Sequence, residues 1–315
     1  MDQFFKEVEL LLNGQALPSR PKLDIVQEKE FVPFTKVNVG YVVYGIALNE
    51  LGQVLMMQEA KPLCKGQWYL PAGRLEPNES IVEGVIREVK EETGMEFEPA
   101  TLIDVLSVGR SYHRFTFYGD IVGGVLKSPE NADKESLQGA WVPVDKILEK
   151  DADYPLRGND IIELIKKAQK RKDGKLCFEN LMPVTTAHKA LSIRLLLACS
   201  SGDHYEILCG TEEALHLPLG EIGHGKLPLL NILKEIFTAI EEKLKVFGIL
   251  SVEYDGKPAK EHDGICISVL VYLPNKDSAT LTSGGKYEWM PVTDETLAGK
   301  IMDRLQPNYN VQYSF

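Results

Sequence analysis

The sequence of 315 residues lacks several features that define specialised classes of protein. Its five cysteines include no Cys-x-x-Cys pair, and an odd number does not suit a disulfide framework, so we expect a reducing compartment. No run of about 18 apolar residues occurs, and charged residues interrupt the N-terminal segment, which therefore does not fit a signal peptide. These absences predict a soluble, cytoplasmic protein with no membrane partner.

The sequence also lacks an excess of basic charge. Lys and Arg number 35 against 46 Asp and Glu, which gives a formal net charge of -11. Such a chain does not have the basic surface expected of a protein that binds nucleic acid polymers, although it is compatible with a small phosphorylated ligand neutralised by divalent cations. Hydrophobic residues make up 44% and charged residues 26%, which indicates a globular chain, and the length favours about two domains.

The hydrophobic pattern predicts an alternation of strands and helices. A short amphipathic helix is expected within residues 1–20, and a β-hairpin over 38–59. A further helix over 80–93 is followed by Gly94 as its C-terminal stop, with strands over 101–108, 114–121 and 139–144 and a helix over 159–171.

Two short motifs recur in the second half of the chain. His216–Gly220 resembles Tyr69–Gly73, and Trp289–Val292 resembles Trp141–Val144. The interval from Gly73 to Trp141 is 68 positions, and that from Gly220 to Trp289 is 69. Residues 191–209 also repeat the two-strand pattern of the first half, and 229–244 is expected to form the corresponding helix. Because order and spacing agree, we infer a tandem duplication rather than a chance recurrence.

Three glutamates, Glu88, Glu91 and Glu92, share one face of the expected helix over 80–93. Like charges at this spacing repel by about 0.2–0.5 kcal/mol per pair, and folding of the helix does not require them. A bound cation would compensate, and Mg²⁺ prefers carboxylate and phosphate oxygens. Arg87, one turn from Glu83 and from Glu91, can hold neighbouring carboxylates in position. A solvated acidic face is the simpler interpretation of any one of these acids, but the complete pattern decides against it.

That pattern comprises nine constrained positions: Gly73, Glu79, Arg87, Glu88, Val89, Glu91, Glu92, Gly94 and Met95. It resembles the signature of the Nudix hydrolase family, whose members cleave nucleoside diphosphates linked to another group. The resemblance implies an α/β class fold, an α/β/α sandwich with a mixed sheet and a loop-helix-loop active site. With the duplication, it implies a second, degenerate Nudix-like α/β domain. The expected division is an N-terminal extension at 1–35, a catalytic domain at 36–175 and the degenerate domain at 183–315.

The resemblance also implies roles for individual residues. Glu88, Glu91 and Glu92 would coordinate Mg²⁺ or Mn²⁺ together with the backbone carbonyl of Ala72, while Glu79 and Arg87 would support the loop and helix. The further acid that the family often draws from another loop is assigned to Glu135, with Asp133 and Glu130 as neighbouring alternatives. The proton of the attacking water would go to Glu91, Glu92 or Glu135.

Segments around the signature resemble those Nudix enzymes that act on oxidised nucleotides, closest over 40–145 and extending to 263–266. The implied reaction is hydrolysis of oxidised purine nucleoside diphosphates (8-oxo-dGDP, 8-oxo-GDP, 8-oxo-dADP) to the monophosphate and phosphate, in nucleotide-pool sanitation. The alternatives are an ADP-ribose or nucleotide-sugar diphosphatase and, in another class, a non-catalytic nucleotide-binding module.

Residues that would bind the nucleotide fall into two groups. Gly73, Arg74 and Lys61 are candidates for contact with the phosphates, though either charge could be ordinary surface. For the base, Tyr44 and Phe117 are stacking candidates, together with Tyr112 and Phe115, and Asn38 is a polar candidate. For each aromatic, burial in the core is the competing interpretation.

The repeat predicts that the second half has lost its metal site. The same offset that relates Gly73 to Gly220 places Lys226, Lys234 and Glu235 at the positions of Glu79, Arg87 and Glu88. Thr238 and Ala239 then stand where the first half has Glu91 and Glu92. Such a domain could stabilise the catalytic half, cap its substrate or mediate a homodimer.

Overall fold

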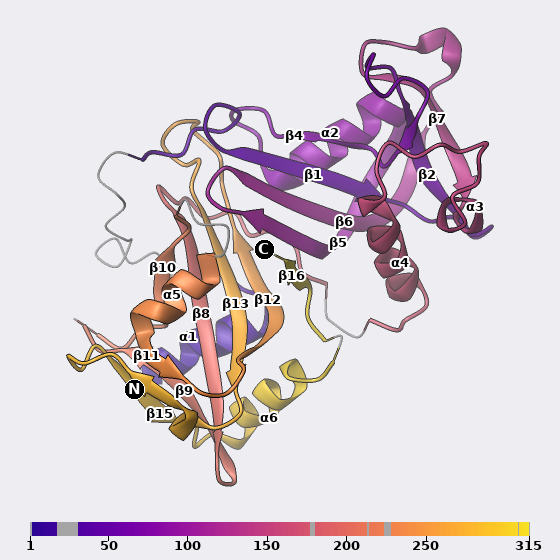
Figure 1. The fold of residues 1–315 in the computed structure, drawn as a ribbon. Helices are drawn as coiled ribbons and strands as arrows, with labels where there is room; N and C mark the ends of the chain where they lie inside the picture. Colours follow the sequence, from indigo (N-terminus) through magenta and orange to yellow (C-terminus); the bar gives the residue numbers. More distant parts are fainter. Residues whose placement is uncertain are drawn as a thin grey trace.

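The structure, a computed structural model, describes residues 2–17, 31–176, 180–212, 214–223, 228–307 and 309–314. Figure 1 shows two α/β units joined along one side, the first half of the chain in purple and the second in orange. The α/β class predicted from the sequence is therefore observed.

The first unit contains two sheets and the helices that cover them. Its elements are β1 (Gly40–Ile46), β2 (Gln53–Glu59), β3 (Trp68–Tyr69), β4 (Ala72–Arg74), α2 (Ile81–Thr93), β5 (Met95–Val108), β6 (Tyr112–Gly124), the short 3₁₀ helix η1 (Pro129–Asn131), β7 (Ser136–Pro143), α3 (Val144–Leu148) and α4 (Asp160–Lys172). The larger sheet has the order β16-β5-β6-β1-β4, and the smaller has the order β3-β2-β7. Because β1 pairs parallel with β6 and antiparallel with β4, the larger sheet is mixed, as predicted.

The hairpin predicted over 38–59 forms only beside its turn, where Leu48 and Val54 make an antiparallel bridge and the Leu55 amide donates to the Ala47 carbonyl at 3.1 Å. The turn forms, since the Gly52 amide donates to the Asn49 carbonyl at 3.3 Å, but β1 and β2 then enter different sheets. Both strands are apolar on both faces, and each is therefore buried between layers instead of forming a two-stranded ribbon.

Helix α2 begins and ends where the sequence predicts. At its start the Ser80 hydroxyl accepts the Glu83 amide while the Glu83 carboxylate accepts the Ser80 amide, a complete capping box. At its end Gly94 has a φ of 78°, a left-handed conformation that glycine adopts without strain. The apolar face is fully buried at Val85 and Val89, directly above Gly45 of β1, where an added Cβ would lie 2.4 Å from Val89.

The second unit repeats most strand pairings of the first, with one difference: its first two strands pair with each other as a hairpin within a single six-stranded sheet. It is built from β8 (Leu191–Ser201), β9 (His204–Gly210), β10 (Leu219–Glu221), α5 (Pro228–Ile236), β11 (Phe237–Ile240), β12 (Lys245–Glu253), β13 (Ile265–Leu273), η2 (Lys276–Ser278), β14 (Ala279–Leu281), β15 (Tyr287–Pro291), α6 (Glu295–Arg304) and β16 (Gln312–Ser314). Strand β8 pairs parallel with β13 and antiparallel with β10, as β1 pairs parallel with β6 and antiparallel with β4. Strand β9 pairs antiparallel with β15, as β2 pairs antiparallel with β7. Gly220 lies in β10 and Gly73 in β4, so the two copies of the motif occupy equivalent strands.

The helix predicted over 229–244 is too long. Its apolar residues end at Ile236, and the chain then turns into β11, which pairs with β14. Thr238 and Ala239 consequently lie on a strand rather than on a helix.

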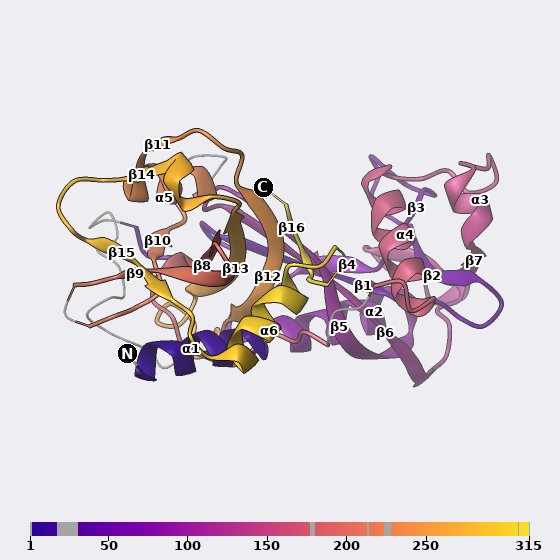
Figure 2. The same cartoon turned by 90° about the horizontal axis from the view of Figure 1, so that it is seen from below.

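The chain termini cross between the two units. Helix α1 (Asp2–Leu12) buries Phe4, Val8 and Leu11 in a core shared with Leu196 and Ile301 of the second unit, and Figure 2 shows it beside α6. At the other end, β16 pairs parallel with β5 of the first unit. The predicted limits of 36–175 and 183–315 remain a prediction, but each terminal element packs on the unit farther from it in sequence.

Candidate functional site

The site is built around a close contact between strand β4 and helix α2. A Cβ added to Gly73 would lie 2.0 Å from the Oε1 of Glu88, so only glycine allows this carboxylate to lie against the strand. Glu88 is 6% exposed, and burial is the main reason that its pKa is raised. The glycine of the signature thus has a steric role in placing the first glutamate.

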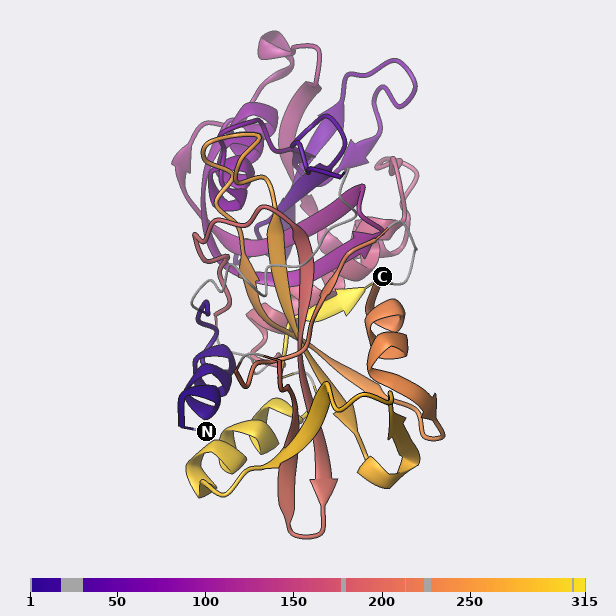
Figure 3. The ribbon, with the colours of Figure 1, turned by 90° about the vertical axis from the view of Figure 1, so that its left-hand side faces the viewer.

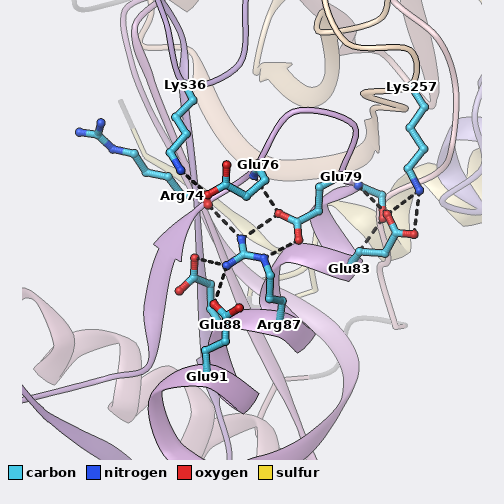
Figure 4. A network of polar contacts seen from close by, with 10 residues as sticks. Lys36, Arg74, Glu76, Glu79, Glu83, Arg87, Glu88, Glu91 and Lys257 are labelled. Atoms are coloured by element: carbon cyan, nitrogen blue, oxygen red, sulfur yellow. Dashed lines mark hydrogen bonds and ion pairs between the residues drawn. The ribbon is translucent and has the colours of Figure 1, made fainter. Parts of the chain in front are cut away.

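Arg87 connects the carboxylates of this region, as Figure 4 shows. Its guanidinium makes two hydrogen bonds to Glu79, at 2.6 and 2.8 Å. The Nη1 atom also donates to Glu88 at 2.8 Å and to Glu91 at 3.0 Å. The predicted contact of Arg87 with Glu91 is present, whereas Glu83 is not among its partners and bonds instead to Lys257 of the second unit. Arg87 therefore fixes two glutamates from one side, and Glu79 fixes Arg87.

Oxygen atoms of Glu88, Glu91 and Glu135 approach within 4.8 Å of one another, a spacing that can hold a metal ion. Elsewhere in the described ranges no other group of three Asp, Glu, His or Cys side chains has this geometry. Glu88 is buried, whereas Glu91 and Glu135 are exposed, so the cluster is open to solvent on one side. Hard oxygen ligands in this number fit a divalent cation such as Mg²⁺.

Glu92 lies outside that cluster. It is 2% exposed, and its carboxylate accepts the backbone amide of Ala72 at 2.8 Å. Burial holds the pKa of Glu92 well above its usual range, and the Ala72 hydrogen bond opposes that shift. The contact joins the end of α2 to the start of β4.

The loop that carries Glu135 is held by its neighbours. The Asp133 carboxylate accepts the amides of Glu135 and Ser136, at 2.9 and 3.0 Å, and its other oxygen accepts the Lys127 ammonium at 2.5 Å. Burial raises the pKa of Asp133, but these bonds outweigh it and lower the value to about 2. Asp133 thus supports the loop, while Glu130 lies on exposed η1 and Glu135 faces Glu88 and Glu91.

A cavity of about 530 Å³ opens beside the carboxylates. Its lining includes the predicted residues Tyr44, Lys61, Ala72, Gly73, Arg74, Arg87, Glu88, Glu91, Glu92, Tyr112 and Glu135. The volume is in the range of small-molecule sites, and acidic, basic and aromatic groups all reach it.

Three of the predicted base-binding residues do not line this cavity. Phe117 and Phe115 are fully buried, and Phe117 pairs with Gly45, which faces α2, whereas Tyr44 lies on the opposite face of β1. Asn38 instead closes a turn, accepting the Phe34 amide at 2.6 Å and donating to Val32 at 2.8 Å.

The cavity is also lined by two residues that the sequence did not point to, Tyr69 and Arg157. Tyr69 donates to Asp160 at 2.9 Å and shares a 2.9 Å hydrogen bond with Tyr44. The Arg157 guanidinium lies 4.8 Å from the centre of the Tyr69 ring and pairs with buried Glu59 at 2.5 Å. Tyr69 belongs to the repeated motif, and that repetition could have identified it as a site residue. Arg157 and Asp160 follow the signature in the chain, and no local sequence pattern marks them as site residues.

The equivalent region of the second unit carries no comparable cluster among the described residues. Lys234 and Glu235 are exposed on α5, and Thr238 and Ala239 are exposed on β11. Lys226, expected at the position of Glu79, lies outside the described residues.

Within the described part of the chain, no helix combines the length and apolar character needed to cross a membrane.

Comparison with known proteins supports the family that the signature predicts. The family model described as the NUDIX domain matches residues 39–162. The chain is 36% identical over 283 residues to the 8-oxo-dGDP phosphatase NUDT18 of Homo sapiens, covering 85% of each chain. It is 33% identical over 324 residues to the protein of the same name from Danio rerio, covering 96% of this chain and 94% of that one. It is also 32% identical over 277 residues to the putative nudix hydrolase 1 of Caenorhabditis elegans, covering 81% of this chain and 74% of the relative. The chain therefore belongs to the Nudix hydrolase family.

Proposed function

We propose that this enzyme hydrolyses oxidised purine nucleoside diphosphates, such as 8-oxo-dGDP, 8-oxo-GDP and 8-oxo-dADP, to the monophosphate and phosphate. The observation that best supports this proposal is the cluster of Glu88, Glu91 and Glu135 at the wall of a cavity large enough for a nucleotide. The similarity to 8-oxo-dGDP phosphatases extends over both halves of the chain. It therefore favours oxidised nucleotides over ADP-ribose or nucleotide sugars, which are supported only by the signature.

We infer that Glu88, Glu91 and Glu135 hold a divalent cation, with Glu92 and the Ala72 carbonyl as the further ligands predicted from the sequence. Mg²⁺ is the expected ion, and Mn²⁺ can replace it. When bound, the cation neutralises charge on the phosphoryl oxygens. The protein supplies a buried, preorganised carboxylate in Glu88, and Arg87 restricts the positions of Glu88 and Glu91 before any ligand arrives.

A carboxylate must also accept the proton of the attacking water. Glu91 and Glu135 are exposed at the cavity, whereas Glu92 is buried and already accepts the Ala72 amide. We therefore favour Glu91 or Glu135 over Glu92 as the proton acceptor. Gln substitutions at each position distinguish them at saturating Mg²⁺, because loss of the proton acceptor lowers kcat even there, whereas loss of a metal ligand alone is overcome by more metal.

The cavity walls suggest how the nucleotide lies. Lys61 and Arg74 line it together with the carboxylates and are suited to the phosphate chain. Tyr44, Tyr69 and Tyr112 line the same cavity, where Tyr112 is half-buried and the other two keep only an edge exposed, 6% and 7%. These edges offer aromatic surface to a purine, in place of fully buried Phe117. We infer that specificity for the base depends on this tyrosine wall.

A turnover panel with Mg²⁺ tests the substrate. Phosphate release from 8-oxo-dGDP should exceed that from dGDP, and both should exceed AMP release from ADP-ribose. A clear preference for ADP-ribose would overturn the oxidised-nucleotide assignment. Binding of 8-oxo-dGDP without turnover, in the presence of Mg²⁺ or Mn²⁺, would instead identify a non-catalytic binding module.

The cellular location, the domain limits and the oligomeric state are also proposals, made from the sequence. We expect the enzyme to act in the cytoplasm on free nucleotides, with 36–175 as the catalytic domain and 183–315 as a degenerate domain. A homodimer is a further prediction, which light scattering of the purified chain tests directly.

A further inference from the structure

The loop that carries Glu79 lies between β4 and α2 and touches the second unit on its outer side. Figure 4 shows Lys257 reaching the start of α2 from the side opposite to the carboxylate cluster. Lys257 belongs to residues 254–263, the segment that joins β12 to β13, which we call the bracing segment. In Figure 3 these two strands extend from the second unit toward the first.

Two polar contacts join the bracing segment to the first unit here, one at the first turn of α2 and one in the loop. The Lys257 ammonium binds the Glu83 carboxylate at 2.7 Å, and this hydrogen bond is the main cause that lowers the pKa of Glu83 to about 2. The Ala259 amide donates to the Asn78 side chain at 2.8 Å. Asn78 has a φ of 66°, a left-handed conformation that asparagine adopts more readily than most residues with a side chain.

A third contact is steric and involves backbone on both sides. An added Cβ on Gly256 would lie 2.8 Å from the carbonyl oxygen of Glu79, so the bracing segment packs directly on the residue that orients Arg87. Gly256 also has a φ of 72°, which favours glycine here.

The bracing segment is itself fixed to the first unit. The buried Asp263 carboxylate accepts the amides of Thr35 and Lys260, at 2.9 and 3.1 Å. The Asp263 carbonyl accepts the Tyr41 hydroxyl at 2.5 Å. The segment therefore has a defined position from which to hold the loop.

We propose that the bracing segment of the second unit is a positioning element of the catalytic site. Lys257 holds the first turn of α2 and the Ala259 amide holds the loop of Glu79, and together they keep Arg87 against Glu88 and Glu91. This inference rests on the proposed metal site. It gives the degenerate half a part in catalysis that does not require ligands of its own.

The contacts of the bracing segment act on the metal site through Glu79 and Arg87, so their removal should affect metal binding indirectly. Loss of a bracing contact allows the loop to shift, Glu79 then holds Arg87 less firmly, and Glu88 and Glu91 are less well placed before metal binds. The expected consequence is weaker metal binding, with less effect on turnover once the metal is saturating. An exposed ion pair is worth up to about 1 kcal/mol, so each single loss should raise the half-saturating Mg²⁺ concentration about two- to fivefold.

The experiment compares matched variants of the full-length protein. Lys257→Ala removes the ion pair, and Lys257→Arg should restore most of it. Asn78→Gly removes the acceptor while allowing the positive φ, and Asn78→Asp retains an acceptor. Lys300→Ala is the control, because Lys300 also makes a 2.7 Å ion pair, to Glu9 within the second unit and away from the site.

Three measurements are made on each variant: the Mg²⁺ dependence of turnover, Mn²⁺ binding by electron paramagnetic resonance without substrate, and thermal unfolding. We expect Lys257→Ala and Asn78→Gly to weaken Mn²⁺ binding, the combined variant to weaken it about tenfold or more, and the Arg and Asp variants to recover it. Lys300→Ala should bind Mn²⁺ like the wild type.

The outcomes separate this inference from the proposed function. If the combined variant binds Mn²⁺ as tightly as the wild type while Glu88→Gln loses binding, the positioning role is wrong and the metal site stands. If Glu88→Gln keeps both Mn²⁺ binding and turnover, the metal site itself is wrong. A loss of unfolding temperature equal to that of Lys300→Ala, with no change in Mn²⁺ binding, also overturns the positioning role, because it leaves only a structural contact.

Discussion

Helices α2 and α5 follow equivalent strands in the two units, yet one carries the candidate site and the other does not. Helix α2 has 13 residues and ends at Thr93, whereas α5 has nine and ends at Ile236. The missing turn is the one that would carry the second and third glutamates. The second unit therefore differs in the length of its helix as well as in the identity of its side chains.

The glycine before each helix shows the same divergence. Gly73 makes room for the carboxylate of Glu88, but Gly220 makes room for Ile232, whose Cγ1 would lie 2.3 Å from an added Cβ. An equivalent backbone approach serves a polar site in one unit and apolar packing in the other. Similar backbone geometry in the two units is thus compatible with different side-chain chemistry.

The largest expected effect comes from the one glutamate that both helices share. Glu88→Gln should lower kcat for 8-oxo-dGDP about 100- to 1,000-fold, because it removes a preorganised carboxylate from the cluster. The matched Glu235→Gln, on an exposed part of α5, should leave kcat unchanged. Phosphate release at saturating Mg²⁺ checks both, and a comparable loss in Glu235→Gln would show that the second unit has chemistry of its own.

A smaller effect is expected at the preceding position. Arg87→Lys keeps the charge but cannot bind Glu79 through two nitrogens while reaching Glu88 and Glu91, so activity should fall about 10- to 100-fold. Lys234→Arg, the reciprocal change on α5, should alter neither activity nor unfolding temperature. Full activity of Arg87→Lys would mean that charge alone suffices and that the fork geometry is unimportant.

Local sequence signals predicted the centre of the site well. The helix over 80–93, its stop at Gly94 and the face shared by Glu88 and Glu91 all depend on neighbours within a few positions. The same reasoning found the repeated motifs, because strand β10 and the glycine within it are short-range features.

Features that depend on register or on distant segments could not be found this way. The strands over 38–59 have an apolar pattern that suits a long hairpin equally well, and only the pairing with β6 and β7 limits the hairpin to the residues beside its turn. Phe117 and Tyr112 lie on the same strand, but whether each faces the helix or the cavity depends on its register with β1. Arg157 enters the site from a segment with no distinguishing local pattern.

A third test uses the two glycines. Gly220→Ala should destabilise the protein by about 1–3 kcal/mol through overpacking against Ile232, with turnover close to wild type. Gly73→Ala displaces the mobile end of Glu88, so it should lower activity about tenfold with little loss of stability. Denaturant unfolding and initial rates distinguish the two, and a reversal of these results would contradict the assignment of polar and apolar roles.

The variant with the smallest expected effect tests whether the second unit lacks a metal site because of its side chains or because of its shorter helix. Thr238→Glu combined with Ala239→Glu restores the missing carboxylates in sequence, but both positions lie on β11, where successive side chains point to opposite faces. The two new carboxylates therefore cannot gather with Glu235 as Glu91 and Glu92 do on α2. In the Glu88→Gln background we expect no gain of Mn²⁺ binding or turnover. A gain would mean that the chain can extend α5 by a turn, and the absence of a second site would then depend on these two side chains alone.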